Sequence, residues 1–473
     1  MKSNAAKLYF VHLGDTMAKI AIAGASGFVG SRLIQKLLDE TEHEIVALSR
    51  SEKKSISPDR LKWRKCDIFS LLDIEKGLKD CDLGIYLVHS MLPSAHLVQG
   101  DFEDFDLLLA DNFAKAAKKC GLQQIIYLGG IIPEKENLSR HLKSRLEVEQ
   151  AFKEVDVALT SLRAGLVIGE GGSSFRIMQN LVRRLPLMLC PRWTQIESSP
   201  IYIDDVLSSI KYCILNDQCY SKEFDLAGSS NITYIEMMKY LASKYDKKPL
   251  LIPVPFFSPN LSKLWVSLVA GAPKNLVYPL IASLKHRMVA RKDSRLEIPN
   301  YKFKSPKEAI DLSYHIQPKE RPAAFKYQAG SEHNEVRSLQ RIVLPQKMTA
   351  QDVAEEYFHW LPKFFKFFVY VKIEELYVKF MIAGVNIPLL TLKFAPDRST
   401  ENRQLFYVRG GLLAKGVGRG RLEFREIFKQ KLVIAGIHEF KPRLPWYLYK
   451  WSQALIHLFT MHAFIKYLYR KRA

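Results

Sequence analysis

The chain has 473 residues, of which 48% are hydrophobic and 25% are charged. This composition is typical of globular proteins, and the length favours two domains that each bury a core. No uninterrupted apolar run reaches the roughly 18 residues that a membrane-spanning helix needs, which argues against such a helix. The six cysteines show no C-x-x-C pair and follow no recognisable secretory leader, so we expect reduced thiols in a cytoplasmic protein.

The net charge of +21 is distributed unevenly along the chain. Residues 331–473 carry 24 lysines and arginines against 12 aspartates and glutamates. This excess indicates anionic surfaces or ligands, or simply a well-solvated surface. The run Arg470-Lys471-Arg472 could meet acidic lipid headgroups at the inner face of a membrane, or form a frayed basic tail. No nucleic-acid-binding motif accompanies the charge, so no nucleic-acid partner is predicted.

A glycine-rich turn near the N-terminus is the strongest indication of a ligand-binding site in the sequence. Residues 19–23 read as a buried strand, and Gly24-Ala-Ser-Gly27-Phe-Val-Gly30 leads into a helical pattern through Leu38. The first glycine permits a tight turn, the second lets backbone approach a pyrophosphate, and the third lets the helix pack on the strand. The helix N-terminus then offers N–H groups to the phosphates, which predicts a dinucleotide site. Residues 1–17 precede the strand and are expected to form an extension.

The second predicted strand, residues 44–48, bears on the choice of cofactor. It ends at Ser49-Arg50, with Lys53 and Lys54 nearby and no carboxylate at the strand end. An acidic residue there would accept a hydrogen bond from a ribose hydroxyl, whereas a cation accommodates a 2′-phosphate. The sequence therefore favours NADP(H) over NAD(H). Arg50 could also stack on the adenine without selecting the phosphate.

Four more strands are predicted, at residues 61–66, 83–88, 124–128 and 157–162, alternating with helices at 71–78, 101–120 and after Ser139. Six strands that alternate with helices predict an α/β fold with a doubly wound parallel sheet of the Rossmann type. His89 and Ser90 follow the fourth strand, at the edge where such sheets bind ligands. A structural role for His89, as a hydrogen-bond donor to a loop, stays open.

Several spaced motifs share a pattern with a known family. They are Gly24–Gly30, Asp67, Leu87-Val-His-Ser-Met91, Tyr127-Leu-Gly-Gly130, Ser139–Arg145, Leu162-Arg-Ala-Gly165, Ser174–Met178, Arg184-Leu-Pro186, Pro191-Arg-Trp193 and Pro200–Val206. Together they resemble the atypical, extended short-chain dehydrogenases/reductases. They look like the bacterial NAD(P)-binding proteins related to the nucleotide-binding accessory subunit of respiratory complex I. The resemblance covers roughly residues 18–289.

The resemblance implies a set of cofactor-binding positions and one departure in the catalytic pair. The implied cofactor-binding residues are Gly24, Ser26, Gly27, Phe28, Val29, Gly30, Arg50, Asp67, Ile68, Val88, His89, Ser90 and Arg145. Competent members of the family use a Tyr-x-x-x-Lys pair, and here His141 and Arg145 stand in its place. Arginine can still bind a ribose or phosphate, and His141 could relay a proton. The candidate catalytic residues are thus His141, Arg145 and His89; the alternative is that the usual proton chemistry is lost or rerouted. No metal site is predicted.

The rest of the chain is predicted to form a linker and a second domain. The Rossmann domain is expected at 18–290, a polar linker at 291–340 and a C-terminal domain at 341–473. Antiparallel strands are predicted at 369–380, 405–413, 421–428 and 432–440, followed by a helix at 445–469. This α+β pattern resembles a helix-grip fold, which implies an apolar cavity and a hydrophobic ligand.

Two functions are compatible with these observations. The first is an NAD(P)H-dependent oxidoreductase acting on a hydrophobic small molecule of quinone or carbonyl type. The second is a non-catalytic nicotinamide-nucleotide sensor, or an accessory factor of a membrane-associated complex. The pair His141 and Arg145 separates them, since it decides whether proton transfer to a substrate is available.

Overall fold

The computed structural model describes residues 17–53, 59–89, 97–134, 137–254, 274–314, 335–344, 348–366, 368–416, 418–429 and 431–471. The predictions for residues 1–16, for Lys54 and for Ser90 lie outside these ranges. The chain divides into two compact units. Unit 1 comprises Met1–His89 and Asn112–Lys326, and unit 2 comprises Ser90–Asp111 and Tyr327–Ala473.

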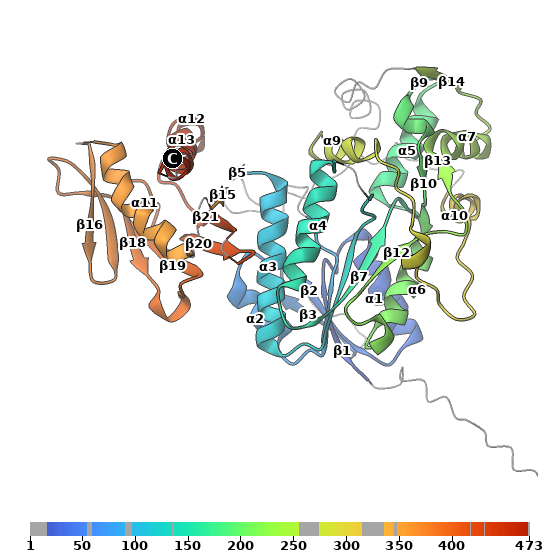
Figure 1. Ribbon diagram of the computed structural model, residues 1–473, viewed down its shortest axis with the longest axis horizontal. Helices are drawn as coiled ribbons and strands as arrows, with labels where there is room; N and C mark the ends of the chain where they lie inside the picture. Colours follow the sequence, from blue (N-terminus) through green and yellow to red (C-terminus); the bar gives the residue numbers. More distant parts are fainter. Residues whose placement is uncertain are drawn as a thin grey trace, which may run out of the picture. The chain divides into compact units, whose positions relative to one another are not determined.

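Unit 1 is built on a seven-stranded parallel sheet with the order β12-β7-β6-β4-β1-β2-β3 (Figure 1). The strands are β1 (Lys19–Ala23), β2 (Glu44–Ser49), β3 (Leu61–Lys65), β4 (Leu83–Tyr86), β6 (Gln124–Gly130), β7 (Ala158–Ala164) and β12 (Lys222–Leu226). The six predicted strands are confirmed, and β12 adds a seventh beside β7. The strand order reverses between β1 and β4, so the predicted doubly wound Rossmann-type sheet is confirmed.

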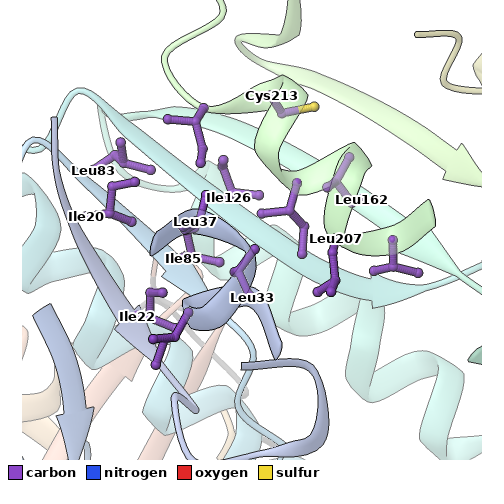
Figure 2. Packing of buried hydrophobic residues seen from close by; sticks show 14 of the residues in the cluster. Ile20, Ile22, Leu33, Leu37, Leu83, Ile85, Ile126, Leu162, Leu207 and Cys213 are labelled. Atoms are coloured by element: carbon purple, nitrogen blue, oxygen red, sulfur yellow. The ribbon is translucent and has the colours of Figure 1, made fainter. Parts of the chain in front are cut away.

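Helices cover both faces of this sheet. They are α1 (Phe28–Glu40), α2 (Leu71–Leu78), α3 (Phe102–Cys120), α4 (Arg140–Lys153) and α6 (Ile203–Cys213). Figure 2 shows the core of one face, where side chains such as Leu33 of α1 and Leu207 of α6 pack on strand residues such as Ile20. On the other face Phe113 of α3 and Phe152 of α4 pack edge-on against Tyr86, with ring centroids 5.1 and 5.0 Å away.

A second layer of unit 1 lies beyond the carboxyl ends of its strands. Its helices are α5 (Ser173–Arg184), α7 (Tyr234–Lys244), α9 (Lys274–Ser283) and α10 (Pro306–Ser313). Its short strands pair as β8 (Val167–Ile168) with β11 (Ile201–Tyr202), β9 (Leu187–Pro191) with β14 (Leu250–Val254), and β10 (Glu197–Ser198) with β13 (Ile232–Thr233). Buried residues of α5, α7, α9 and α10 form a core of their own. Part of the stretch expected to be a linker is therefore structured, because Ser305 and Glu308 form a capping box that starts α10 with Pro306 in its first turn.

Unit 2 holds an eight-stranded mixed sheet with the order β16-β17-β18-β19-β20-β21-β15-β5. The strands are β5 (Leu97–Gln99), β15 (Val336–Val343), β16 (Val369–Glu374), β17 (Tyr377–Ile382), β18 (Pro388–Phe394), β19 (Arg403–Gly410), β20 (Arg421–Ile427) and β21 (Leu432–Phe440). Neighbouring strands are antiparallel except β15 and β5, which are parallel. Helices α11 (Ala350–Phe364), α12 (Trp446–Trp451) and α13 (Gln453–Arg470) contribute buried residues to one core with the sheet.

Unit 2 differs from the sequence-based prediction in several elements, and its strands β5, β15 and β18 were not predicted. The expected strand at 369–380 is a hairpin, because Glu375 between β16 and β17 adopts a left-handed φ of 46°. The expected C-terminal helix is interrupted at Ser452, whose φ of −129° and ψ of −88° separate α12 from α13. The structure also adds α11, which begins at a capping box formed by Thr349 and Asp352.

Side chains of strand β20 alternate between an apolar and a charged face of the sheet in unit 2. Leu422 and Phe424 belong to the core with the helices, whereas Glu423 and Arg425 alternate with them and form a buried ion-pair network. Arg425 is 1% exposed and donates to Glu423 and to Asp111, with Nη2–Oε1 and Nη1–Oδ2 distances of 2.5 and 2.7 Å. Burial alone would raise the pKa of Glu423, but the charges of Arg425 and Arg403 hold it well below its ordinary value.

Candidate functional site

In the glycine turn between β1 and α1, a side chain in place of Gly24 or Gly30 would collide with the backbone. Gly24 has a left-handed φ of 85°, and a Cβ there would lie 3.0 Å from the Leu87 carbonyl. A Cβ on Gly30 would lie 2.3 Å from the Gly24 oxygen, so only glycine lets helix α1 approach the turn this closely. Gly27 is exposed and forms the N-cap of α1 without a side-chain hydrogen bond. The first N–H groups of α1 thus meet no capping side chain at this position, which suits a phosphate.

Cations flank this turn on one side. The Lys53 ammonium lies 3.2 Å from Ser26 Oγ and 4.2 Å from the centre of the Trp63 ring. Arg50 is exposed directly after β2. The structure therefore brings Lys53 to the glycine turn, with Arg50 at the end of the adjacent strand, as a 2′-phosphate would require.

Phe28 and Arg32 connect the start of α1 to a second glycine turn. The Arg32 guanidinium lies 4.7 Å from the Phe28 ring centre and donates to the Glu170 carbonyl at 2.7 Å. A Cβ on Gly169 would lie 2.9 Å from the Phe28 ring. The turn at residues 169–172 thus packs against the start of α1, which forms part of the predicted dinucleotide site.

His89, Arg145 and His141 lie together at the carboxyl ends of β4 and β6. Arg145 Nη2 is 2.5 Å from His89 Nδ1, and the His89 and His141 rings are 5.1 Å apart. A guanidinium has no acceptor, so His89 Nδ1 accepts this hydrogen bond and the neutral ring carries its proton on Nε2. The Tyr127 hydroxyl donates to the Arg145 carbonyl at 3.3 Å. The three residues proposed for catalysis are therefore neighbours.

A buried ion pair fixes the helix that carries His141 and Arg145. Glu149 of α4 accepts hydrogen bonds from Arg163 of β7 at 2.9 and 2.7 Å and from Ser161 at 2.7 Å. Burial alone would raise the pKa of Glu149, but Arg163 outweighs it and lowers this pKa to about 2. At its other end, α4 is capped by Ser139, as predicted, and the Ser139 N–H donates to His286 Nε2 at 3.1 Å. Both ends of α4 are thus held by side-chain hydrogen bonds.

An apolar cavity of about 170 Å³ opens beside His141 in unit 1. Its wall includes Gly130 at the end of β6 and Gly165 after β7, while α5, α7 and α9 supply most of the apolar side chains. Those apolar residues include Ile177, Met178, Leu181, Met238, Val277, Leu280 and Ile281. The polar groups in the wall are few: Ser174, Trp193, Tyr234 and Ser283 accompany His141. Burial raises the pKa of Tyr234 to about 12, which keeps its hydroxyl protonated at neutral pH.

The other candidate residues lie near the same edge of the sheet. Asp67 Oδ1 accepts from the Phe69 N–H at 3.2 Å, and the Ile68 carbonyl accepts from Asn112 at 3.1 Å. Val29 and Val88 are half-buried. Among the described residues, no cluster of three or more histidine, cysteine, aspartate or glutamate side chains could hold a metal ion.

Sequence reasoning did not find the cavity walls or the anchor of α4. The walls come from three helices that lie far apart in the chain, so no local spacing connects them. The Glu149–Arg163 pair likewise joins α4 to β7. The sequence carries a signal only for Glu149, because this acidic residue lies on the same helical face as the apolar Leu142, Val148 and Phe152.

Three comparisons place unit 1 among known proteins. Residues 24–180 match a family model described as NAD(P)H-binding. The auxiliary protein GraX of Staphylococcus aureus is 27% identical over 123 residues, which cover 26% of this chain and 39% of GraX. The chain thus spans about two fifths of that relative. UDP-glucose 4-epimerase of Vibrio cholerae is 22% identical over 267 residues, which cover 50% of this chain and 79% of the epimerase.

A solved structure shares the fold. Triphenylmethane reductase of Citrobacter sp., complexed with NADP(H), superposes with a TM-score of 0.50 and 18% identity, covering 63% of this chain and 100% of the reductase. At this identity the likeness concerns the fold alone. Together with the family match and the strand order, it leads to one conclusion: unit 1 contains an NAD(P)-binding domain with a Rossmann-type fold.

Proposed function

We propose that this chain is an NADPH-dependent oxidoreductase that reduces a hydrophobic small molecule of quinone or carbonyl type. The observation that carries the proposal is the apolar cavity of about 170 Å³ beside His141. His141 both lines this cavity and lies 5.1 Å from His89, ring to ring, at the edge where the sheet would bind a nucleotide. A substrate in the cavity would thus meet a titratable group on its nucleotide-facing side.

The choice of NADPH rests on charge at the glycine turn. Lys53 contacts Ser26, and Arg50 follows the adjacent strand. Two cations favour a 2′-phosphate over a free hydroxyl. The triphenylmethane reductase of the same fold was solved with NADP(H), which agrees with this choice.

The chain's own residues suggest how the reaction proceeds. The cofactor, when bound, supplies a hydride. His141 donates the proton that the substrate oxygen gains and so replaces the family's tyrosine, since histidine is the commonest general acid in enzymes. Arg145 cannot lose its proton, so it holds His89 in one tautomer and contributes positive charge beside the developing oxyanion. The apolar walls exclude water from the transfer.

The second candidate is a nucleotide sensor that performs no turnover. It is favoured by the residues on α4, where His141 and Arg145 stand in place of the family's Tyr-x-x-x-Lys pair and Arg145 already bonds His89. Both candidates bind NADPH, so only turnover distinguishes them.

The experiment measures NADPH oxidation by the purified full chain with a panel of benzoquinones, naphthoquinones and aromatic aldehydes. We expect turnover with at least one class, and His141→Ala should lower kcat by about 10²- to 10⁴-fold with an unchanged NADPH Kd. His359→Ala, an exposed histidine of unit 2, is the matched control and should keep full activity. NADPH binding without any turnover would favour the sensor.

A further inference from the structure

Unit 2 exposes a group of large apolar side chains on its C-terminal helices. Tyr447, Trp451 and Phe459 are 69%, 73% and 66% exposed, although aromatic side chains of this size are usually covered. Leu448, Leu455 and Ile456 are about half exposed beside them. We call these six residues the C-terminal patch. An exposed apolar group of this kind marks an interaction surface.

On α13, the C-terminal patch lies on the side opposite to the residues that pack in the core. Helix α13 buries its opposite side, where Met461, Phe464 and Leu468 are at most 2% exposed and pack in the core of unit 2. Leu455 and Phe459 stand one turn apart on the outward side, so the helix is apolar on both faces at this end. Phe459 also contacts Phe364 of α11, with ring centroids 5.9 Å apart, so α11 borders the patch.

The segment that carries the patch has basic residues and no acidic ones. From Lys441 to Ala473 the sequence contains seven lysines and arginines and no aspartate or glutamate. The outward stripe that holds Leu455 and Phe459 continues at helical spacing to Lys466 and Arg470, both exposed. The Lys450 ammonium lies 5.5 Å from the centre of the Trp451 ring. Lys471 is paired with Glu356 of α11 at 2.8 Å, so the cations available beside the aromatic residues of the patch are chiefly Lys450, Lys466 and Arg470.

We propose that the C-terminal patch docks unit 2 on an anionic membrane surface, with α12 and α13 lying in the interface. Trp, Tyr and Phe partition into the headgroup region, and each nearby lysine or arginine adds attraction to acidic lipids. Within the described residues, no helix is both long and apolar enough to cross a bilayer, so the contact is peripheral. A second copy of the chain fits the patch less well, because two such cationic surfaces repel each other. The proposal does not depend on catalysis in unit 1.

The test is vesicle co-sedimentation of the full chain with phosphatidylcholine, with and without phosphatidylglycerol, at low and high salt. We expect binding that requires phosphatidylglycerol and weakens with salt. The double variant Trp451→Ser, Phe459→Ser should lower the partition coefficient at least tenfold, since it removes two large apolar groups from the interface. Lys466→Gln together with Arg470→Gln should lower it by about fivefold per charge.

Leu312→Ser is the control, because Leu312 is 54% exposed on α10 of unit 1 and far from the patch in sequence. It should leave vesicle binding unchanged. Circular dichroism checks that all variants keep the fold. The proposal is overturned if the chain ignores phosphatidylglycerol, or if the control loses as much binding as the patch variants. It is also overturned if the patch variants convert a dimer to a monomer in light scattering without altering vesicle binding, since the patch would then join two copies.

Discussion

At the scale of single residues, Arg50 is the position on which the choice of cofactor depends. It is exposed after β2, and a charge-assisted hydrogen bond to a 2′-phosphate is worth about 1.5–3 kcal/mol. Arg50→Ala should therefore weaken NADPH binding by roughly ten- to a hundredfold and NADH binding by about twofold, because 1.4 kcal/mol is a factor of ten. Calorimetric titration of both cofactors measures this, with Lys239→Ala, an exposed cation on α7, as the control.

Equal losses for NADPH and NADH would mean that Arg50 stacks on the adenine without selecting the phosphate. The loss should also shrink at high ionic strength, because exposed charges are screened. Lys53 is expected to add a smaller effect in the same direction, since its ammonium already contacts Ser26.

At the scale of elements, the Glu149–Arg163 pair joins α4 to β7 and so positions His141. Glu149→Gln removes two charge-assisted hydrogen bonds from Arg163, which keeps Glu223 at 2.5 Å, and should lower the free energy of unfolding by about 1.5–3 kcal/mol. Because the pKa of Glu149 is lowered to about 2, its contribution is present above the ordinary pKa of 4.5 and disappears as pH falls toward 2. Urea unfolding at neutral and acidic pH should therefore show a smaller acid loss in the variant than in the parent. Glu154→Gln, an exposed acid at the end of α4, should behave like the parent, and an equal response of the two variants would refute the role of Glu149.

The elements that sequence could predict are those with local signals. Strands β1, β2 and β4 are short apolar runs, and Ser139 caps α4 as its side chain and position require. Strand β5 has three residues, and its place beside β15 depends on pairing across more than two hundred residues. The sequence did not predict the hairpin of β16 and β17, because the left-handed residue of its turn is Glu375 and not a glycine.

The candidate site likewise contains residues that the sequence could predict and contacts that it could not. Gly24, Gly27 and Gly30 could be found from spacing alone, whereas His141 and Arg145 came from the family resemblance, which puts a Tyr-x-x-x-Lys pair at their positions. The contact of Arg145 with His89 joins helix α4 to the end of β4, so it depends on how the helix packs on the sheet. The cavity needs three further helices; the motif Ser174–Met178 marks α5 in the sequence, but no local pattern connects α5 with α7 and α9.

At the scale of the whole molecule, the two units hold separate hydrophobic cores. We predict that calorimetric unfolding departs from a single two-state transition, with a calorimetric enthalpy above the van't Hoff enthalpy. Arg425→Met breaks the buried network of unit 2 and should lower only one of the transitions, while Glu149→Gln lowers the other. A single transition that both variants shift equally would show that the units unfold as one.

The central claim is that the glycine turn of unit 1 binds NADPH. Gly27 is exposed at the start of α1, and a Cβ there lies 3.1 Å from the Gly24 oxygen, so the fold can accept a side chain with a small shift. A valine would nevertheless stand where the pyrophosphate meets the backbone. The most direct measurement is calorimetric titration of NADPH into the parent chain and into Gly27→Val, with circular dichroism to confirm folding. The account predicts saturable binding to the parent and a loss of at least a hundredfold in the folded variant; unchanged affinity in Gly27→Val, or no binding to the parent, would contradict it.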